Sequence, residues 1–193
     1  MGIYLNPGTI EFQESINSEI YVDKTMLIER TNAALRTKQK YMCISRPRRF
    51  GKSMAADMLA AYYGKDYDSA ALFDGLEISH CETFSTHLNK YNVFKINMQE
   101  FLSMTQNVDK MLKVLQKRLI KELNYPEYVD CDNLVFAMQD IFSYTGQSFI
   151  VLIDEWDCLF REYKQDEEAQ RKYLDFLRVW LKDKGYIALA YMT

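Results

Sequence analysis

The most continuous apolar stretch of the chain, Ser-Phe-Ile-Val-Leu-Ile at residues 148–153, constrains the fold more than any other segment. Neighbouring side chains of a strand point to opposite sides of a sheet, so a strand that is apolar throughout must be covered on both faces. Such strands occur in parallel sheets that carry helices on both sides. We therefore expect residues 148–153 to form the central strand of an α/β domain.

Three further apolar runs predict strands, at residues 40–45, 91–98 and 186–191. Apolar residues recur at helical spacing within residues 54–62, 108–123, 134–142 and 173–181. Strands that alternate with helices predict a mainly parallel sheet with right-handed crossovers. The chain of 193 residues is long enough for one sizeable domain, which we divide into a flanking N-terminal segment, residues 1–39, and a core, residues 40–193.

The composition restricts the classes of partner and compartment. The net charge of −3 argues against a protein that coats nucleic acid through bulk charge, although a local basic loop can still contact phosphate. The N-terminus lacks the basic start and apolar stretch of a secretory signal, and no apolar run approaches membrane-spanning length. The four cysteines are scattered, which suits a reducing compartment. We expect a cytoplasmic protein with no membrane partner.

Residues 45–53, Ser-Arg-Pro-Arg-Arg-Phe-Gly-Lys-Ser, end like a phosphate-binding loop of the pattern Gly-x-x-x-x-Gly-Lys-Ser/Thr, with Arg46 at the first glycine position. The loop lies between a predicted strand and a predicted helix, where backbone N–H groups and the helix dipole favour phosphate. Gly51 would allow the backbone to approach closely, Lys52 would reach the β- and γ-phosphates, and Ser53 would place its hydroxyl on Mg²⁺. The alternative is a basic turn followed by a helix cap.

A second motif follows the apolar run of residues 148–153, because Asp154 and Glu155 come directly after it. Asp154 would hold Mg²⁺, directly or through water, and Glu155 would polarise the attacking water as a general base. Ligands collect at the carboxyl ends of parallel strands, where both motifs would lie. The alternative is an acidic turn after a buried strand, but two motifs in this order favour a nucleotide site.

The segment Tyr-Val-Asp-Lys-Thr, residues 21–25, has two interpretations. It would wrap the adenine end of a nucleotide, with Tyr21 stacking and Asp23 or Lys24 making polar contacts. Alternatively, Asp23 or Thr25 caps the helix that follows.

The three arginines of the loop and the acidic residue Asp157 also leave alternatives open. Arginine suits planar, bidentate contacts, so the loop arginines would contact phosphates or pair with Asp157. Otherwise they form a solvated basic turn, and Asp157 caps the segment that follows it. These arginines are Arg46, Arg48 and Arg49.

Five segments together resemble the AAA-ATPase-like family of predicted bacterial and archaeal ATPases, in order over nearly the whole chain. They are YVDKT (21–25), RPRRFGKS (46–53), LFDGLEI (72–78), YNVFKINM (91–98) and LIDEWD (152–157). The resemblance implies a three-layer P-loop NTPase of the ASCE/AAA type, in which the arginine at position 46 is usual. The family sequence normally continues with Gly and a further strand, and often with a restriction-nuclease-like domain, so the resemblance implies a core that is truncated at its C-terminus.

The resemblance also implies the roles of individual residues. Lys52 and Ser53 match the phosphate-loop pair, and Asp154 and Glu155 match the Walker B pair; Lys52 and Glu155 would be catalytic, and Ser53 and Asp154 would hold the metal. Thr193 falls where the family presents a polar residue beside the γ-phosphate. The nucleotide-binding residues expected in this way are Arg46, Pro47, Arg48, Arg49, Phe50, Gly51, Lys52, Ser53, Met54, Tyr21, Asp23 and Thr193.

The expected function is Mg²⁺-dependent binding and hydrolysis of ATP by a motor or switch domain. ATP is expected rather than GTP because the chain has no guanine-specifying Asn-Lys-x-Asp motif. Two alternatives remain: a nucleotide-gated interaction module with little or no hydrolysis, and a component of a nucleic-acid-targeting defence protein. We also expect self-association, because the strand at residues 40–45 would be an open apolar edge.

Overall fold

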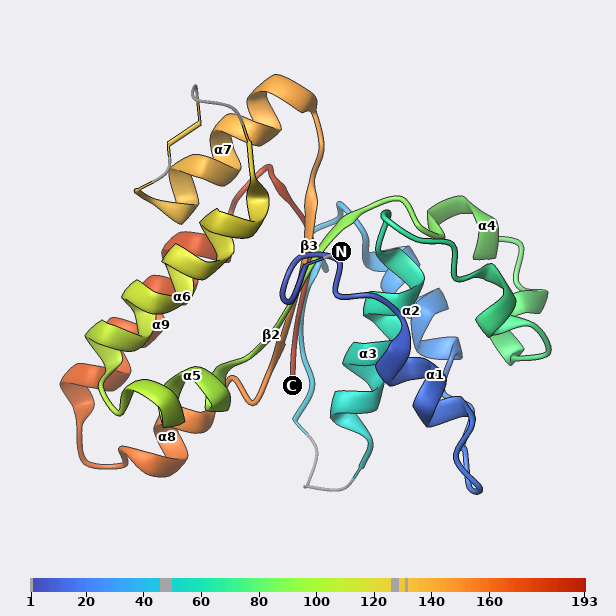
Figure 1. The fold of residues 1–193 in the computed structure, drawn as a ribbon, viewed down its shortest axis with the longest axis horizontal. Coiled ribbons are helices and arrows are strands. Elements are labelled where there is room, and N and C mark those ends of the chain that lie inside the picture. The colour runs from blue at the N-terminus through green and yellow to red at the C-terminus, as the bar shows by residue number, and fades with distance from the viewer. Residues whose placement is uncertain (1, 46–49, 126–128, 131) are drawn as a thin grey trace.

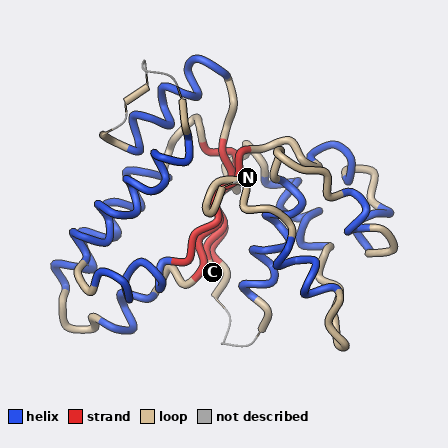
Figure 2. Tube along the Cα trace, viewed as in Figure 1, coloured by secondary structure: helices blue, strands red, loops and turns tan. Residues whose placement is uncertain are grey.

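The described strands form one parallel sheet between two layers of helices (Figures 1 and 2). The computed structural model describes residues 2–45, 50–125, 129–130 and 132–193. The sheet is four-stranded and has the order β1-β4-β3-β2. Its strands are β1 (Tyr41–Cys43), β2 (Asn92–Asn97), β3 (Phe149–Asp154) and β4 (Ile187–Met192). All neighbouring pairs are parallel, so the predicted α/β fold with a parallel sheet is confirmed.

The central strand β3 behaves as its apolar sequence predicts. All six of its residues are buried, and its five apolar side chains are shared between two hydrophobic cores. Phe149 and Val151 belong to one core, whereas Ile150 and Leu152 belong to the other. A one-residue shift of this strand would keep both faces apolar, so its register depends on its neighbours as well.

Each face of the sheet carries its own set of helices. The first core lies beneath α5 (Met98–Thr105), α6 (Val108–Leu123), α7 (Leu134–Thr145), α8 (Cys158–Glu162) and α9 (Glu167–Leu181). The second core lies beneath α1 (Ile10–Ile16), α2 (Met26–Ala34), α3 (Lys52–Tyr63), α4 (Phe84–His87) and the short 3-10 helices η1 (Ala70–Phe73) and η2 (Glu77–His80). None of the helices described has both the length and the apolar character that a membrane crossing requires.

Local signals in the sequence set several helix ends. Asn97, Asn107 and Asn133 each precede a helix and accept a hydrogen bond from a backbone N–H of its first turn. Helix α7 ends at Gly146, whose φ of +67° is a left-handed conformation that glycine adopts without strain. The helix whose apolar residues span 173–181 begins at Glu167, where Asp166 caps an acidic first turn.

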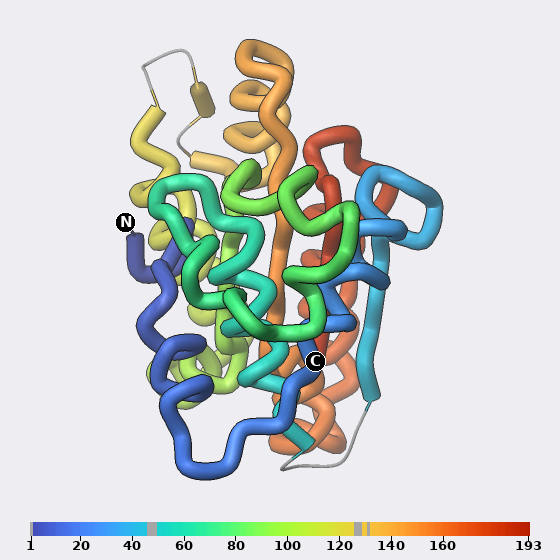
Figure 3. Tube along the Cα trace, turned by 90° about the vertical axis from the view of Figure 1, so that its right-hand side faces the viewer, coloured from blue at the N-terminus to red at the C-terminus, as the bar shows by residue number. Residues whose placement is uncertain are grey.

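The N-terminal residues take part in the second helical layer (Figure 3). Asn6 donates its backbone N–H to the carbonyl of Val93 at 2.8 Å and accepts the Val93 N–H on its side chain at 2.8 Å. Phe12 and Ile28, from α1 and α2, are buried in the same core as α3. The boundary between residues 1–39 and 40–193 stays a prediction.

Strand β1 lies at one edge of the described sheet and is shorter than the predicted strand at residues 40–45. Its side chains at Tyr41 and Cys43 are exposed. An exposed edge offers unpaired backbone groups to another strand. The expected self-association follows from the same geometry and stays a prediction.

Candidate functional site

Asp154, the last residue of β3, is the buried centre of a polar cluster at the carboxyl edge of the sheet. The Ser53 hydroxyl donates to Oδ2 of Asp154 at 2.5 Å, and the Thr193 hydroxyl donates to Oδ1 at 2.8 Å. Asp154 and Thr193 are only 6% and 2% exposed. The three side chains come from the start of α3, the end of β3 and the residue after β4. The structure thus brings together residues that the sequence predicted to share a site.

Register explains why these residues meet. Asn97 pairs with Asp154 across β2 and β3, and Ile153 pairs with Met192 across β3 and β4. Cys43, the last residue of β1, also pairs with Met192. The strands therefore end at about the same level, and the polar residues Asn97, Asp154 and Thr193 lie at their common edge.

The visible part of the phosphate-loop motif begins helix α3. Gly51 has a φ of +72° and is the N-terminal cap of this helix, so Lys52 and Ser53 occupy its first turn. The first backbone N–H groups of a helix have no partner within it and favour an anion. Residues 46–49 lie outside the described residues, so the roles of Arg46, Pro47, Arg48 and Arg49 stay predictions. The remaining loop residue, Phe50, has a 57% exposed side chain.

Lys24 reaches the phosphate loop from the N-terminal segment. Its Nζ donates to the backbone carbonyl of Phe50 at 2.9 Å. A Cβ at position 51 would lie 2.8 Å from the same Nζ, so a side chain there would meet Lys24 and would also strain the left-handed backbone. The sequence predicted a polar contact of Lys24 with the adenine end of a nucleotide, whereas the structure places its charge beside the loop of Lys52.

Asp23 links the N-terminal segment to its neighbours. Its carboxylate accepts the N–H of Thr25 at 2.8 Å and the N–H of Glu77 at 2.8 Å. Partial burial by itself would raise the pKa of Asp23, but these hydrogen bonds outweigh it and lower the pKa. The carboxylate of Asp23 therefore has a structural role, because it holds the backbone at Thr25 and Glu77. Its contact with nucleotide stays a prediction.

Tyr21 is half-buried next to the start of α3. Its ring packs edge-on against Phe12, with centroids 6.5 Å apart, and burial raises the pKa of its phenol to about 12. Tyr21, Lys24 and Met54 line a narrow apolar crevice at this point. The stacking of Tyr21 on adenine stays a prediction.

A polar cavity of about 380 Å³ opens in front of Ser53 and Asp154. Asn97 at the end of β2 and the ion pair between Asp57 and Lys95 form part of its wall. Burial raises the pKa of Asp57, and the ion pair with Lys95 only partly offsets this. The cavity therefore offers carboxylate oxygens next to the first turn of α3, and the cation in its wall, Lys95, is already paired with Asp57.

The donor set around Asp154 fits a magnesium ion that is shared with phosphate. Mg²⁺ takes oxygen ligands and is held through one or two carboxylates together with phosphate oxygens and water. Ser53 and Asp154 provide a hydroxyl and a carboxylate oxygen within 2.5 Å of each other. Within the part of the chain that the structure describes, no group of three or more His, Cys, Asp and Glu residues could hold a metal by itself.

Glu155, the predicted general base, is engaged with a residue that the sequence analysis missed. Its carboxylate forms an ion pair with Arg161 of α8, which also pairs with Asp157. Arg161 donates in addition to Oε1 of Gln99 at 3.2 Å. The four-residue spacing between Asp157 and Arg161 on a helix was a signal that could have revealed this pair.

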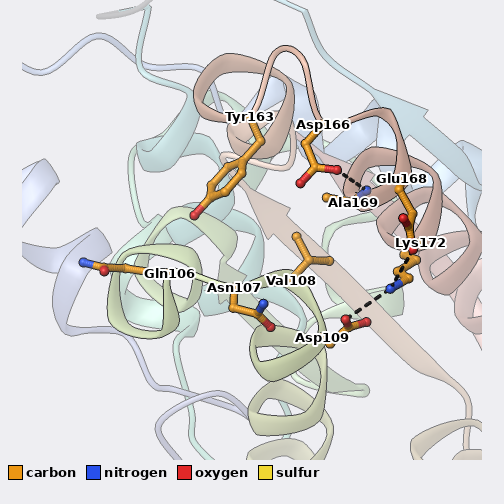
Figure 4. Close-up of a pocket in the computed structure, with 9 residues that line it drawn as sticks. All are labelled: Gln106, Asn107, Val108, Asp109, Tyr163, Asp166, Glu168, Ala169 and Lys172. Carbon is orange, nitrogen blue, oxygen red and sulfur yellow. Dashed lines mark hydrogen bonds and ion pairs between the residues drawn. The ribbon is translucent and has the colours of Figure 1, made fainter.

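Another polar pocket lies between the α5–α6 turn and the α8–α9 turn (Figure 4). Figure 4 shows Lys172 directed at Asp109, and this lysine bonds Asp109 at 3.1 Å and Glu168 at 3.2 Å. Asp166 accepts the N–H of Ala169 at 2.9 Å and caps α9. These contacts give the polar groups a structural role, and the pocket shares no residue with the Asp154 cluster.

Comparison with known proteins identifies the family of the chain. The sequence model of the AAA-ATPase-like family, described as predicted AAA-ATPase, matches residues 7–188. No curated protein and no solved structure matches the chain. The matched region contains the described start of α3, the Asp-Glu motif at the end of β3 and most of the sheet. The chain therefore belongs to the AAA-ATPase-like family of predicted AAA-ATPases.

Proposed function

We propose that this chain is an ASCE/AAA-type P-loop ATPase core that binds ATP with Mg²⁺ and hydrolyses it as a motor or switch. The contact of the Ser53 hydroxyl with the Asp154 carboxylate, at 2.5 Å, carries the proposal. It joins the end of a phosphate-loop motif to the end of a buried strand, although the two residues are 101 positions apart in the chain. Family membership supports an ATPase-like role for this site.

The binding role of each residue follows from its position. Lys52 would contact the β- and γ-phosphates from the first turn of α3, whose N–H groups and dipole favour negative charge. Lys24 would add a second positive charge beside the loop. Ser53 and Asp154 would hold the magnesium ion, which when bound would neutralise charge on the β- and γ-phosphates. Thr193 would keep Asp154 oriented through its hydrogen bond.

The proposed reaction transfers the γ-phosphoryl group to water. The oxygen of water attacks the γ-phosphorus, the bond from this phosphorus to the β,γ-bridging oxygen breaks, and ADP leaves with the electron pair. The proton of the water passes to the carboxylate of Glu155. Lys52 and the N-terminus of α3 stabilise the charge that develops on the phosphoryl oxygens.

A titration with and without metal tests the site directly. We expect wild type to bind a non-hydrolysable ATP analogue more tightly with Mg²⁺ than with EDTA in calorimetry. Asp154→Asn removes the charge and keeps the shape, so we expect it to lower the affinity in Mg²⁺ by at least about tenfold and to abolish the metal dependence. Asp166→Asn is the matched control, because asparagine caps α9 as well as aspartate does.

Binding that is equal in Mg²⁺ and EDTA for wild type would contradict the proposed metal site. Binding that is equal for wild type and Asp154→Asn would show that the metal is held elsewhere. A thermal unfolding curve for each variant separates a loss of binding from a loss of fold.

Lys24→Ala tests the second cation at the loop. We expect the affinity for the ATP analogue to fall by about three- to tenfold, because one exposed charge-assisted contact is lost. Lys38→Ala removes the same charge before β1, at the amino end of the sheet, and should leave the affinity unchanged. If Lys24→Ala and Lys38→Ala bind the ATP analogue with equal affinity, Lys24 does not contribute to nucleotide binding and only bonds the Phe50 carbonyl.

A second candidate function is a nucleotide-gated interaction module with little turnover. The ion pair between Glu155 and Arg161 favours it, because the carboxylate that would accept the proton is already engaged. Nucleotide binding without detectable hydrolysis in both wild type and variants of this pair would support the module over the ATPase.

A further inference from the structure

The carboxylate of Glu155 is paired with Arg161 and does not line the described cavity in front of Ser53 and Asp154. The backbone of Glu155 has a φ of +52°, a left-handed conformation, and its N–H donates to Oδ1 of Asp154 at 2.9 Å. Its side chain pairs instead with Arg161, on the α5 and α8 side of the sheet. Among the described residues, Ser53 and Asp154 line the cavity at the metal position, and Glu155 is not part of that lining.

Arg161 is held in place from three directions. Its guanidinium contacts Glu155 and Asp157 by ion pairs and Gln99 by a hydrogen bond. Partial burial by itself would lower the pKa of Arg161, but its contacts with Glu155 and Asp157 outweigh this and raise the pKa. The guanidinium therefore stays charged near neutral pH.

The ion pair with Arg161 occupies the carboxylate that Glu155 would need as a general base. A carboxylate can accept a proton from water only when one of its oxygens is free to bond that water in line with the γ-phosphorus. We propose that Arg161 is a positioning residue that holds Glu155 in a resting place, so that separation of this ion pair gates hydrolysis. The inference rests on the proposed ATPase function.

The ion pair is well suited to open and close. The side chains of Arg161 and Glu155 are 29% and 27% exposed, and pairs that water reaches are weak. Asp157 and Gln99 would keep Arg161 paired after Glu155 leaves, so no cation would be left without a partner. Gln99 lies on α5, directly after β2, and the gate is therefore linked to the strand end that carries Asn97.

Single-turnover hydrolysis at saturating Mg²⁺–ATP tests the gate. We expect Arg161→Gln to raise the rate by about two- to fivefold, which matches the free energy of a partly exposed ion pair, and to leave the ATP affinity unchanged. In a Glu155→Gln background the same substitution should leave the hydrolysis rate unchanged, because the carboxylate that Arg161 would release is no longer present. A purely structural role of Arg161 would affect both backgrounds equally, so the comparison distinguishes the two roles.

Two matched variants complete the test. Arg161→Lys keeps the charge and should stay near the wild-type rate, and Arg178→Gln breaks an exposed pair with Asp175 on α9 and should also leave the rate unchanged. A rate of Arg161→Gln that is equal to or below wild type, with normal ATP binding, would overturn the gate and leave the ATPase proposal standing. Absence of Mg²⁺–ATP binding by wild type in calorimetry would instead overturn the proposed function itself.

Discussion

Glu155→Gln is expected to slow single-turnover ATP hydrolysis by about 10²- to 10⁴-fold, which is the usual contribution of a positioned general base. The substitution keeps the shape of the side chain and removes its ability to take a proton. Glu155 does not contact the ground-state nucleotide in the proposed mechanism, so the affinity for Mg²⁺–ATP should stay within about twofold of wild type, inside the effect of a typical exposed substitution. Rapid quench of radiolabelled ATP measures the rate, and calorimetry measures the affinity.

Glu167→Gln is a matched control for this prediction. It removes the same charge from the exposed first turn of α9, outside the Asp154 cluster, and should leave the rate unchanged. Equal rates for Glu155→Gln and wild type, with normal ATP binding by both, would show that another group accepts the proton. The chain would then be better described as a nucleotide-responsive binding module.

Lys52→Ala is expected to weaken the binding of Mg²⁺–ATP by about 2–3 kcal/mol, or roughly 30- to 150-fold, which is the scale of a strong charge-assisted contact. The ammonium group would face the β- and γ-phosphates from the first turn of α3. Its removal should leave the melting temperature nearly unchanged, because the lysine lies at the N-terminus of a helix and outside both hydrophobic cores. Calorimetric titration of both proteins measures the effect.

Lys65→Ala provides a comparison within the same layer, just after the end of α3. Its Nζ bonds Gln147 at 2.9 Å, and its removal takes away one charge without touching the loop. Affinities that are equal for wild type and Lys52→Ala would contradict the phosphate-loop assignment. A fall in affinity for both lysine variants would indicate a general effect of charge rather than a contact of Lys52.

Much of the fold could be predicted because each element carries its own local signal. The apolar run at residues 148–153 predicted a strand that is buried on both faces, and β3 is buried at all six positions. The helix over residues 108–123 has the predicted bounds, since an apolar stripe, an asparagine cap and a following proline all agree. Helix α9 extends ahead of the apolar residues 173–181 through an acidic first turn, where carboxylates meet the positive end of the helix dipole.

The sequence predicted some residues of the candidate site and missed others. The residues that the sequence placed at strand ends and helix starts, Ser53, Asp154 and Thr193, lie together as expected. The placement of Lys24 beside the phosphate loop was not predicted, because it depends on how the N-terminal segment packs against α3. Asp23 has a structural role for the same reason, since its partner Glu77 is 54 residues away.

The sequence by itself thus determined that β3 is buried on both faces, that the strands lie in parallel and that polar residues at their ends meet, because periodicity and strand polarity are local properties. Only the tertiary structure decided the state of Glu155. A long, partly exposed side chain has several rotamers, and the one that it adopts depends on charges contributed by other elements. Here that charge is Arg161 on α8, which pairs with both Glu155 and Asp157.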